Sequence, residues 1–326
     1  MKQSMNQIRL GRSDLLVSRI AFGTWQLGGD WGPTDSEAAI AAIRRAADSG
    51  VSFFDTAQAY GFGASESLLA EALRGRHRDE LVIATKGGLR PGGAGVVRDA
   101  SAEWIRTGVE QSLRALDTDY VDLFQIHWPD PETPFDETAE ALGKLVADGK
   151  IRHVGVSNFD AAQIETFSAS LPVETLQPPY HLFRREIEKD VLPYTAAQDI
   201  GVMVYGPLAH GLLGGNLQPG TRFAQGDWRA KSPVFQGEDY RRNLQVVADL
   251  RAFAGDELGI TLGQLAIAWT LANPAVQVAI VGTRNPNHVD EALAAGEIEL
   301  DGAAMARIDD LMRDAVAIAG PTPDSV

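Results

Sequence analysis

Residues 53–60 read FFDTAQAY, an apolar strand that runs directly into an aspartate and then a tyrosine. A buried strand that ends in a polar residue is ordinary when taken alone. Three later segments repeat the arrangement, because each apolar run ends in a group able to serve in proton transfer: LVIATK at 81–86, VDLFQIH at 121–127 and VGVSN at 154–158. The repetition indicates parallel strands whose carboxyl ends carry functional side chains.

The remainder of the chain alternates strands and helices. Apolar runs predict strands at 20–25, 53–55, 81–86, 121–127, 151–157, 175–177, 202–205 and 277–281. Amphipathic patterns predict helices at 35–50, 65–74, 102–116, 136–148, 161–169, 189–198, 240–258, 262–271, 286–295 and 303–314. Strands that are apolar on both faces need helices on both sides of a sheet, or a sheet closed on itself. Eight such units favour closure, so we expect an α/β fold of the (β/α)8 TIM barrel type.

An open, doubly wound sheet is the rival fold. It would need a GxGxxG phosphate loop directly after its first strand. The residues there read GTWQLGG at 23–29, which lack that spacing and do not open directly into a helix. The closed barrel is therefore the better interpretation.

Three segments stand outside the alternation. Two short strands around GRSD at 11–14 predict an N-terminal β-hairpin. Residues 210–238 form a long connection rich in Gly, Arg and aromatic residues, which we expect to act as a lid over the carboxyl-terminal face of the barrel. Residues 320–324, GPTPD, predict a frayed tail after the extra C-terminal helices. We treat residues 1–326 as a single domain.

Composition excludes several classes of function. The chain has 326 residues, of which 44% are hydrophobic, so it can bury a large core. Its formal charge of −15 argues against binding to nucleic acid or to an anionic membrane surface. The absence of cysteine excludes disulfides, thiolate catalysis and cysteine-ligated metals. No apolar run suggests a signal peptide or a membrane span, so we expect a cytoplasmic protein.

In a closed parallel barrel the carboxyl ends of all strands emerge on one face. Asp55, Tyr60, Lys86 and His127 should therefore converge, although they lie far apart in sequence. A tyrosine hydroxyl is a poor acid near neutral pH unless a cation such as Lys86 stabilises its phenolate, and Asp55 would hold that cation. His127 could orient a carbonyl. Each residue also has an ordinary structural interpretation: a cap, a surface lysine or a core histidine.

Together these residues resemble the catalytic set of the aldo-keto reductase superfamily. The contexts FFDTAQAYGFGASE, IATKGG and DLFQIHWPDP carry the resemblance, joined by GVSNF, LQPPY, VYGPLAHGLL and IVGTRNP. It covers nearly the whole chain and is greatest for bacterial reductases of the inositol-operon type. The resemblance implies NADPH-dependent reduction of aldehydes or ketones, with Tyr60 as general acid, Lys86 and Asp55 tuning it, and His127 positioning the carbonyl of a small-molecule substrate.

The resemblance also implies where NADPH or NADP+ binds. Ser157, Asn158 and Gln177 match residues that hold the carboxamide, and Tyr205 matches the ring on which the nicotinamide stacks. The full set of expected cofactor residues is Gly23, Thr24, Trp25, Asp55, Ser157, Asn158, Gln177, Tyr205, Gly206, Pro207, Leu208, Ala209, Gly211, Leu212, Gly282, Thr283, Arg284, His288 and Glu291. A helix N-terminus with Arg284 suits the adenosine 2′-phosphate. His288 and Ala292 depart from the residues of many relatives, which leaves the affinity for the adenine end of the cofactor open.

The substrate pocket is expected to have aromatic walls. Its predicted residues are Trp25, Trp31, Tyr60, His127, Trp128 and Trp228, which suit aryl or short-chain aldehydes. Two other functions stay open: a non-enzymatic, cofactor-sensing subunit resembling potassium-channel β subunits, and a Schiff-base aldolase with Lys86 as nucleophile. The sequence indicates no metal and leaves the oligomeric state undetermined.

Overall fold

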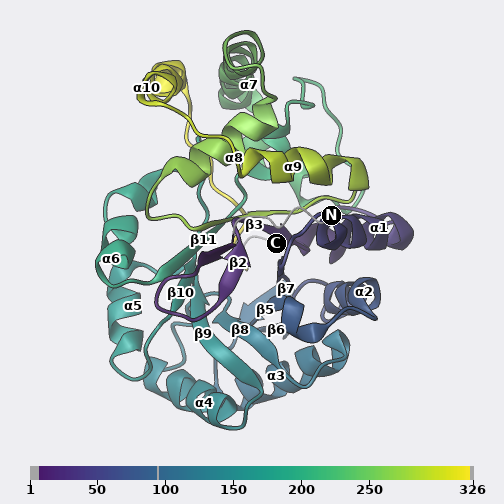
Figure 1. Cartoon of the computed structure of the whole chain (residues 1–326), viewed down its shortest axis with the longest axis vertical. Helices are drawn as coiled ribbons and strands as arrows, with labels where there is room; N and C mark the ends of the chain where they lie inside the picture. The colour runs from purple at the N-terminus through teal and green to yellow at the C-terminus, as the bar shows by residue number, and fades with distance from the viewer. Residues whose placement is uncertain (1–6, 94, 324–326) are drawn as a thin grey trace.

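A closed barrel of parallel strands forms the centre of the computed structural model, which describes residues 7–93 and 95–323 (Figure 1). Around the barrel the strands follow the order β10, β11, β12, β3, β4, β5, β8 and β9. Their bounds are β3 (Ile20–Gly23), β4 (Phe53–Asp55), β5 (Val82–Gly87), β8 (Val121–Ile126), β9 (Ile151–Ser157), β10 (Thr175–Gln177), β11 (Gly201–Tyr205) and β12 (Val278–Val281). The predicted (β/α)8 barrel is confirmed.

Helices surround the barrel and bury their apolar stripes against it. The ring consists of α1 (Ser36–Asp48), α2 (Ala64–Leu73), α3 (Ala102–Leu116), α4 (Phe135–Ala147), α5 (Ala161–Ser168), α6 (Val191–Ala197), α8 (Leu262–Ala272) and α9 (Val289–Ala295). Polar residues fix where several helices begin. Asp35 accepts the N–H of Ala38 at the start of α1, and Thr261 and Gln264 cap α8 reciprocally. The helices α7 (Gly237–Ala252) and α10 (Gly302–Leu311) lie outside this ring (Figure 1).

One end of the barrel is closed by the predicted N-terminal hairpin, which is confirmed. Its strands β1 (Gln7–Arg9) and β2 (Leu16–Ser18) pair antiparallel, with Ile8 opposite Val17. Leu10, Leu15 and Val17 are buried with barrel-lining residues of β3, β4, β5, β8, β11 and β12 in one core cluster. The carboxyl ends of the strands therefore form the accessible mouth of the barrel.

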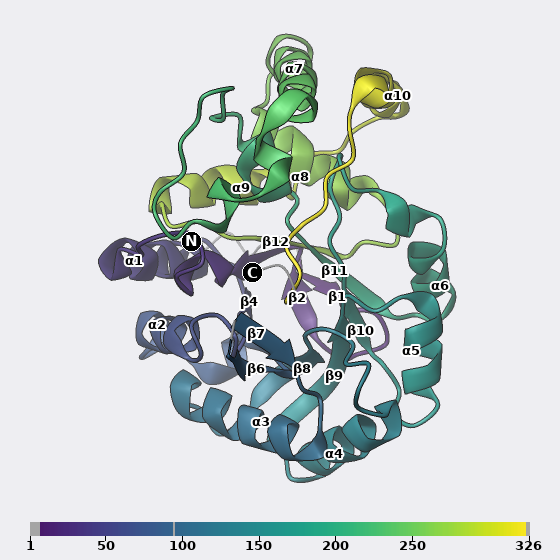
Figure 2. The ribbon, with the colours of Figure 1, turned by 180° about the vertical axis from the view of Figure 1, so that it is seen from behind.

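An unpredicted hairpin follows β5 at the mouth. Its strands are β6 (Leu89–Gly92) and β7 (Gly95–Arg98), with Leu89 opposite Arg98. Residues 89–98 read LRPGGAGVVR, and the glycines and proline indicate a loop rather than a strand pair. Figure 2 shows this hairpin on the opposite side of the barrel from β1 and β2.

Of the predicted frayed tail at 320–324, Pro321, Thr322 and Pro323 line the cleft at the mouth of the barrel, and Asp324 lies outside the described residues. The segment after α10 returns across the molecule to the mouth of the barrel (Figure 2). Two long-range contacts hold its course: the N–H of Val316 bonds to Asn243 Oδ1 (2.8 Å), and the N–H of Ile318 bonds to the Phe183 carbonyl (3.0 Å). The order of this tail depends on those contacts rather than on local propensity.

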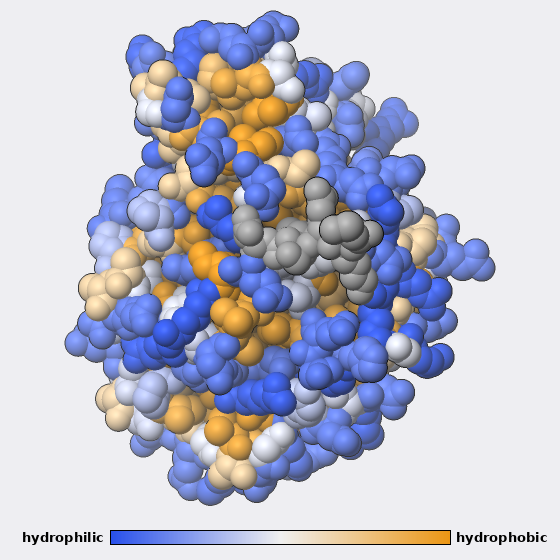
Figure 3. Space-filling model, viewed as in Figure 1, coloured by the Kyte–Doolittle hydropathy of each residue, from blue (hydrophilic) through white to orange (hydrophobic). Residues whose placement is uncertain are grey.

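The outer surface is mainly hydrophilic on the side of the barrel that carries the N-terminal hairpin of β1 and β2 (Figure 3). Hydrophobic residues show there between the helices. Within residues 7–93 and 95–323, no helix combines the length and the apolar character that crossing a bilayer requires.

Candidate active site

The structure brings the four predicted catalytic residues together at the mouth. Lys86 Nζ donates to Asp55 Oδ2 (2.7 Å) and to the Thr56 carbonyl (2.9 Å), and it lies 3.3 Å from the Tyr60 hydroxyl. The His127 ring meets the Tyr60 ring edge to face, with centroids 5.6 Å apart. Asp55 closes β4, Lys86 lies in β5 and His127 follows β8, so neighbouring strand ends supply three of the four groups.

The second oxygen of Asp55 is also engaged. Gln177 Nε2 donates to Asp55 Oδ1 across 2.8 Å, and Gln125 Nε2 approaches the same oxygen at 3.5 Å. In the closed strand order β10, which carries Gln177, lies directly across the barrel from β4. Gln177 was predicted only as a cofactor residue and Gln125 was not predicted. A glutamine inside an apolar strand, as in VDLFQIH, was the available signal.

Burial sets the protonation of these groups. Burial, followed by the charges of Asp55 and Asp30, raises the pKa of Tyr60 well above its usual value, so the phenol holds its proton at rest. Burial lowers the pKa of Lys86, and the charge of Asp55 opposes that shift. Burial and the charge of Lys86 hold the pKa of His127 well below its usual range, so its imidazole is neutral. The site thus offers one phenolic proton beside a buried lysine and a neutral histidine.

Close backbone contact places Tyr60. A Cβ atom at Gly28 would lie 2.7 Å from the Tyr60 carbonyl carbon, so only glycine lets the two segments pack this closely. Beyond Tyr60 the backbone is left-handed for three residues, including Phe62 at φ 46°. A phenylalanine in that conformation is strained, and it lines the cleft with 42% of its surface exposed.

Indole rings form the wall opposite Tyr60. Trp25 and Trp31 meet edge to face at 5.0 Å, and Trp228 stacks on Trp25 at 6.0 Å. Trp228 comes from the long segment 210–238, and its N–H bonds to the Asp30 carbonyl (3.0 Å). The next residue, Arg229, pairs with Asp227 (2.6 Å) and lies over the Trp31 ring at 4.5 Å. The 210–238 segment therefore packs on the mouth, as the lid prediction requires.

A cleft of about 760 Å³ runs along the mouth from these aromatic rings to the loop after β12. Asn158 lines the cleft and has a left-handed conformation (φ 63°). Its Nδ2 donates to the His127 carbonyl (2.9 Å) and its Oδ1 accepts from the Tyr205 hydroxyl (2.9 Å). Tyr60 and His127 line this cleft together with Arg284 and His288.

Comparisons with known proteins place this geometry in a family. The family model described as "Aldo/keto reductase family" matches residues 19–313. The chain belongs to the aldo/keto reductase family. It is therefore an oxidoreductase of carbonyl compounds within a family that uses NADP(H).

Three relatives show how far the likeness extends. The aldo-keto reductase YhdN of Bacillus subtilis (strain 168) is 41% identical over 289 residues, which cover 88% of this chain and 87% of that protein. The solved glycerol dehydrogenase AKR11B4 from Gluconobacter oxydans is 38% identical with a TM-score of 0.87, covering 97% of this chain and 98% of that one. A Klebsiella pneumoniae aldo-keto reductase solved with NADPH is 32% identical with a TM-score of 0.73, covering 95% and 96%.

Most of the residues expected at the family's cofactor site line the cleft. These are Gly23, Trp25, Asp55, Ser157, Asn158, Gln177, Tyr205, Gly206, Pro207, Leu208, Gly211, Gly282, Thr283, Arg284 and His288. A Cβ atom on Gly206 would meet only His210 Cε1, at 3.9 Å, so the backbone there borders open space. A cleft of this volume, lined by this backbone and by the Arg284 guanidinium, fits a dinucleotide.

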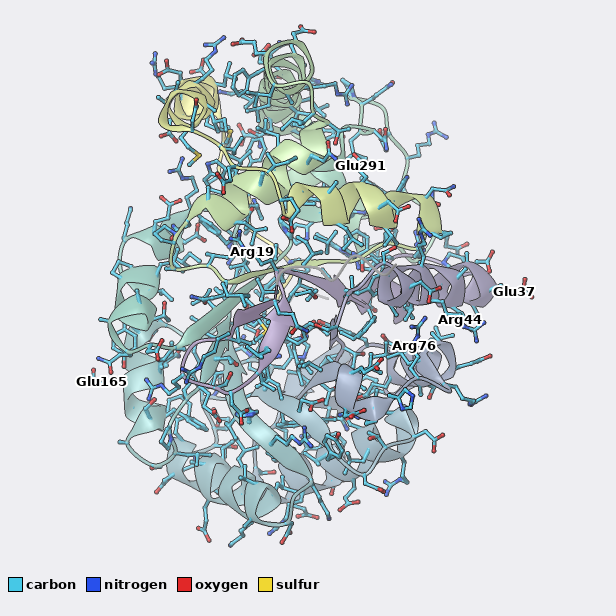
Figure 4. All side chains as sticks on the ribbon, in the orientation of Figure 1. Arg19, Glu37, Arg44, Arg76, Glu165 and Glu291 are labelled. Atoms are coloured by element: carbon cyan, nitrogen blue, oxygen red, sulfur yellow. The ribbon has the colours of Figure 1, made fainter. Side chains whose placement is uncertain are left out.

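Four of the expected cofactor residues lie elsewhere. Thr24, Ala209 and Leu212 are fully buried behind the cleft wall. The Thr24 hydroxyl accepts a hydrogen bond from Ser65 Oγ (2.7 Å), so it serves the packing of the loop after β3. Glu291 lies on α9, where its carboxylate accepts from Thr261 Oγ1 (2.5 Å) of the neighbouring cap (Figure 4).

Arg284 bridges two loops in this structure. Its Nη1 donates to the carbonyls of Pro33 (3.0 Å) and Trp31 (3.3 Å). The loop after β12 is thus tied to the loop after β3, at the edge of the cleft. Backbone carbonyls neutralise no charge, so the guanidinium keeps its full positive charge for an anion.

Several residues that line the cleft were not predicted. They are Asp30, Phe62, Leu89, Val96, His210, Asn216, Arg229 and the tail residues Pro321, Thr322 and Pro323. Asp30 stands in GGDWG, which indicates a turn, and the tail reaches the cleft only through contacts with distant residues. The predicted substrate residues Trp25, Trp31, Tyr60, His127, Trp128 and Trp228 all line it.

Proposed function

We propose that this protein reduces aldehydes and ketones to alcohols with NADPH, using Tyr60 as the general acid. One observation carries the proposal: Tyr60 lines a cleft, and its hydroxyl lies 3.3 Å from the buried Lys86 Nζ, which is itself 2.7 Å from Asp55. Burial raises the pKa of Tyr60, and a buried cation beside the phenol offsets part of that cost by stabilising the phenolate as the proton leaves.

Each residue of the site has a separate role in the proposed reduction. NADPH supplies a hydride when bound. Tyr60 gives its proton to the carbonyl oxygen, and Lys86 stabilises the phenolate that remains, while Asp55 balances the charge of Lys86. His127 is neutral and lines the cleft beside Tyr60, so it can donate an N–H to the same oxygen. The indole wall excludes water from the reacting end.

The cleft also indicates how the cofactor is held. Ser157, Asn158 and Gln177 would bind the carboxamide, with the Tyr205 ring beneath the nicotinamide. The backbone from Gly206 to Gly211 would follow the pyrophosphate. Arg284 would pair with the 2′-phosphate, because a guanidinium binds a dianion in bidentate fashion. The Klebsiella relative solved with NADPH supports NADPH as a cofactor, and the preference over NADH rests on Arg284.

The alternatives have less support. A cofactor-sensing subunit would need the cleft but no proton donor, whereas here all four catalytic groups are in contact. A Schiff-base aldolase would need Lys86 as a free amine. Its Nζ instead has three oxygen partners, and the side chain is only 1% exposed.

The test compares native protein with the Tyr60→Phe variant, following NADPH absorbance with 4-nitrobenzaldehyde and running NADH in parallel. We expect turnover by native protein, a loss of about a thousandfold or more in the variant, and a preference for NADPH. Tyr194→Phe on α6 is the matched control, because it removes a phenol hydroxyl outside the cleft. NADPH binding without turnover in native protein would instead support the cofactor-sensing alternative.

A further inference from the structure

The Asp30 carboxylate is an unpaired charge in the wall of the cleft. It lines the cleft, and its hydrogen bond from Trp25 Nε1 is long, at 3.4 Å. Among the residues that the structure describes, no Lys, Arg or His forms an ion pair with it. Arg229 also lines the cleft, but its guanidinium is already engaged by Asp227 and the His210 carbonyl. Asp30 therefore keeps most of its capacity to accept hydrogen bonds.

The position of Asp30 is fixed and lies near the reacting end. Its main-chain carbonyl accepts the N–H of Trp228, which joins its loop to the 210–238 segment. Trp25, whose Nε1 contacts the carboxylate, has its ring centroid 6.4 Å from that of Tyr60. The charge of Asp30 is close enough to contribute to the raised pKa of Tyr60. The carboxylate is thus one indole ring away from the proton donor.

A carboxylate in this place discriminates between substituents. An alkyl group placed against it would remove water from a charge without replacing the lost hydrogen bonds, which is unfavourable. A second carboxylate would be repelled. A hydroxyl group would instead donate a short, charge-assisted hydrogen bond. The indole rings around it offer apolar contact to a short carbon skeleton.

We propose that Asp30 is a specificity-determining residue that selects carbonyl substrates with hydroxyl groups next to the carbonyl, over alkyl and carboxylate-bearing ones. This inference rests on the reductase function proposed above, since it assigns the substrate class of the same site. Hydroxyaldehydes and hydroxyketones of short chain length are the class that it names.

The test measures kcat/KM for two matched pairs of substrates. Glyceraldehyde and propanal share a three-carbon skeleton and differ in hydroxyl groups, whereas succinic semialdehyde and butanal share a four-carbon skeleton and differ in a carboxylate. We expect native protein to prefer glyceraldehyde over propanal by about tenfold or more, since a hydrogen bond to a charged group is worth that much. Butanal should be preferred over succinic semialdehyde.

Two variants separate charge from hydrogen bonding. Asp30→Leu should abolish the preference for glyceraldehyde. Asp30→Asn keeps an acceptor oxygen, so it should retain part of that preference while relieving the exclusion of succinic semialdehyde. The control Glu37→Gln makes the same change in net charge on the outer surface of α1, away from the cleft (Figure 4), and should leave both ratios unchanged. The dissociation constant of NADPH, measured by fluorescence quenching, checks that each variant keeps its fold.

The outcomes are distinguishable. Equal kcat/KM values for glyceraldehyde and propanal in native protein, or an unchanged ratio in Asp30→Leu, would overturn the role of Asp30 and leave the reductase proposal intact. No turnover of any of the four substrates or of 4-nitrobenzaldehyde would overturn both proposals.

Discussion

Lys86 Nζ and Asp55 Oδ2 form an ion pair 2.7 Å long in which the side chains are only 1% and 4% exposed. Each charge depends on the other, because water cannot replace a missing partner. We predict that Lys86→Met lowers the free energy of unfolding by about 3 kcal/mol or more. The double variant with Asp55→Asn should recover part of that loss. Urea unfolding measures both.

The matched control for that experiment is Lys144→Met, which breaks an exposed pair with Glu140 on α4. It should cause no measurable change. A double variant as unstable as Lys86→Met would show that the loss comes from packing of the lysine chain rather than from the uncompensated charge.

The pH dependence of carbonyl reduction should have an alkaline limb and no step from His127. Burial lowers the pKa of Lys86 below its usual value, so the cation that stabilises the phenolate is lost, as pH rises, at a lower pH than in a free lysine. His127 is neutral throughout, because burial holds its pKa well below the usual range. We therefore expect kcat/KM to fall as pH rises through the pKa of Lys86, and to show no step in the range where a free histidine titrates. A step near about pH 6.5 that disappears in His127→Asn would contradict the assignment.

Arg284 should decide between the two nicotinamide cofactors. We predict that Arg284→Leu raises the dissociation constant of NADPH at least about tenfold, with a much smaller effect on NADH, because only NADPH carries the 2′-phosphate. Fluorescence quenching of the protein measures both constants. Arg313→Leu, on an exposed turn after α10, controls for net charge. Equal weakening of both cofactors would mean that Arg284 acts by holding the Trp31 and Pro33 carbonyls.

His153 should make stability depend on pH. Its Nδ1 lies 2.7 Å from Glu174 and its Nε2 lies 2.9 Å from Asp14, so it joins the N-terminal hairpin to β9 and the segment before β10. The hydrogen bond to Glu174 is the largest cause of its raised pKa. A raised folded-state pKa means that the stabilisation is complete below the unfolded value and is lost as pH rises through the folded value.

The contribution of His153 is about 1 kcal/mol, since Asp14 is exposed and adds little. Native protein should therefore exceed His153→Gln in unfolding free energy at about pH 5.5, and the difference should shrink as pH rises through the folded-state pKa of His153. A difference that does not change with pH would assign His153 a packing role only.

The barrel and the convergence of the proposed catalytic residues could be predicted because their signals are local. Each strand is an apolar run, and each catalytic residue stands at or just after a strand end, so the rule that parallel strands end on one face brought Asp55, Lys86 and His127 together. The bounds of α3 and β9 agree with the predicted ranges to the residue.

The parts that could not be predicted depend on distant contacts. The strands β6 and β7 contain glycine and proline, and within the described part of the chain they pair only with each other. The tail reaches the cleft because Asn243 and Phe183 hold it there. Asp30 was not predicted because a single acidic residue among glycines indicates a turn. Its free capacity to accept hydrogen bonds depends on the pairing of Arg229 with Asp227, which the sequence does not indicate.

The contact between Gln177 and Asp55 has a consequence for folding studies. It spans the interior between opposite strands, so the carboxylate that holds Lys86 is correctly oriented only after the sheet has closed. The rate at which activity recovers during refolding would therefore report closure of the barrel. Circular dichroism would report the formation of helices and strands. A delay between the two signals would measure how long an open, secondary-structured intermediate persists.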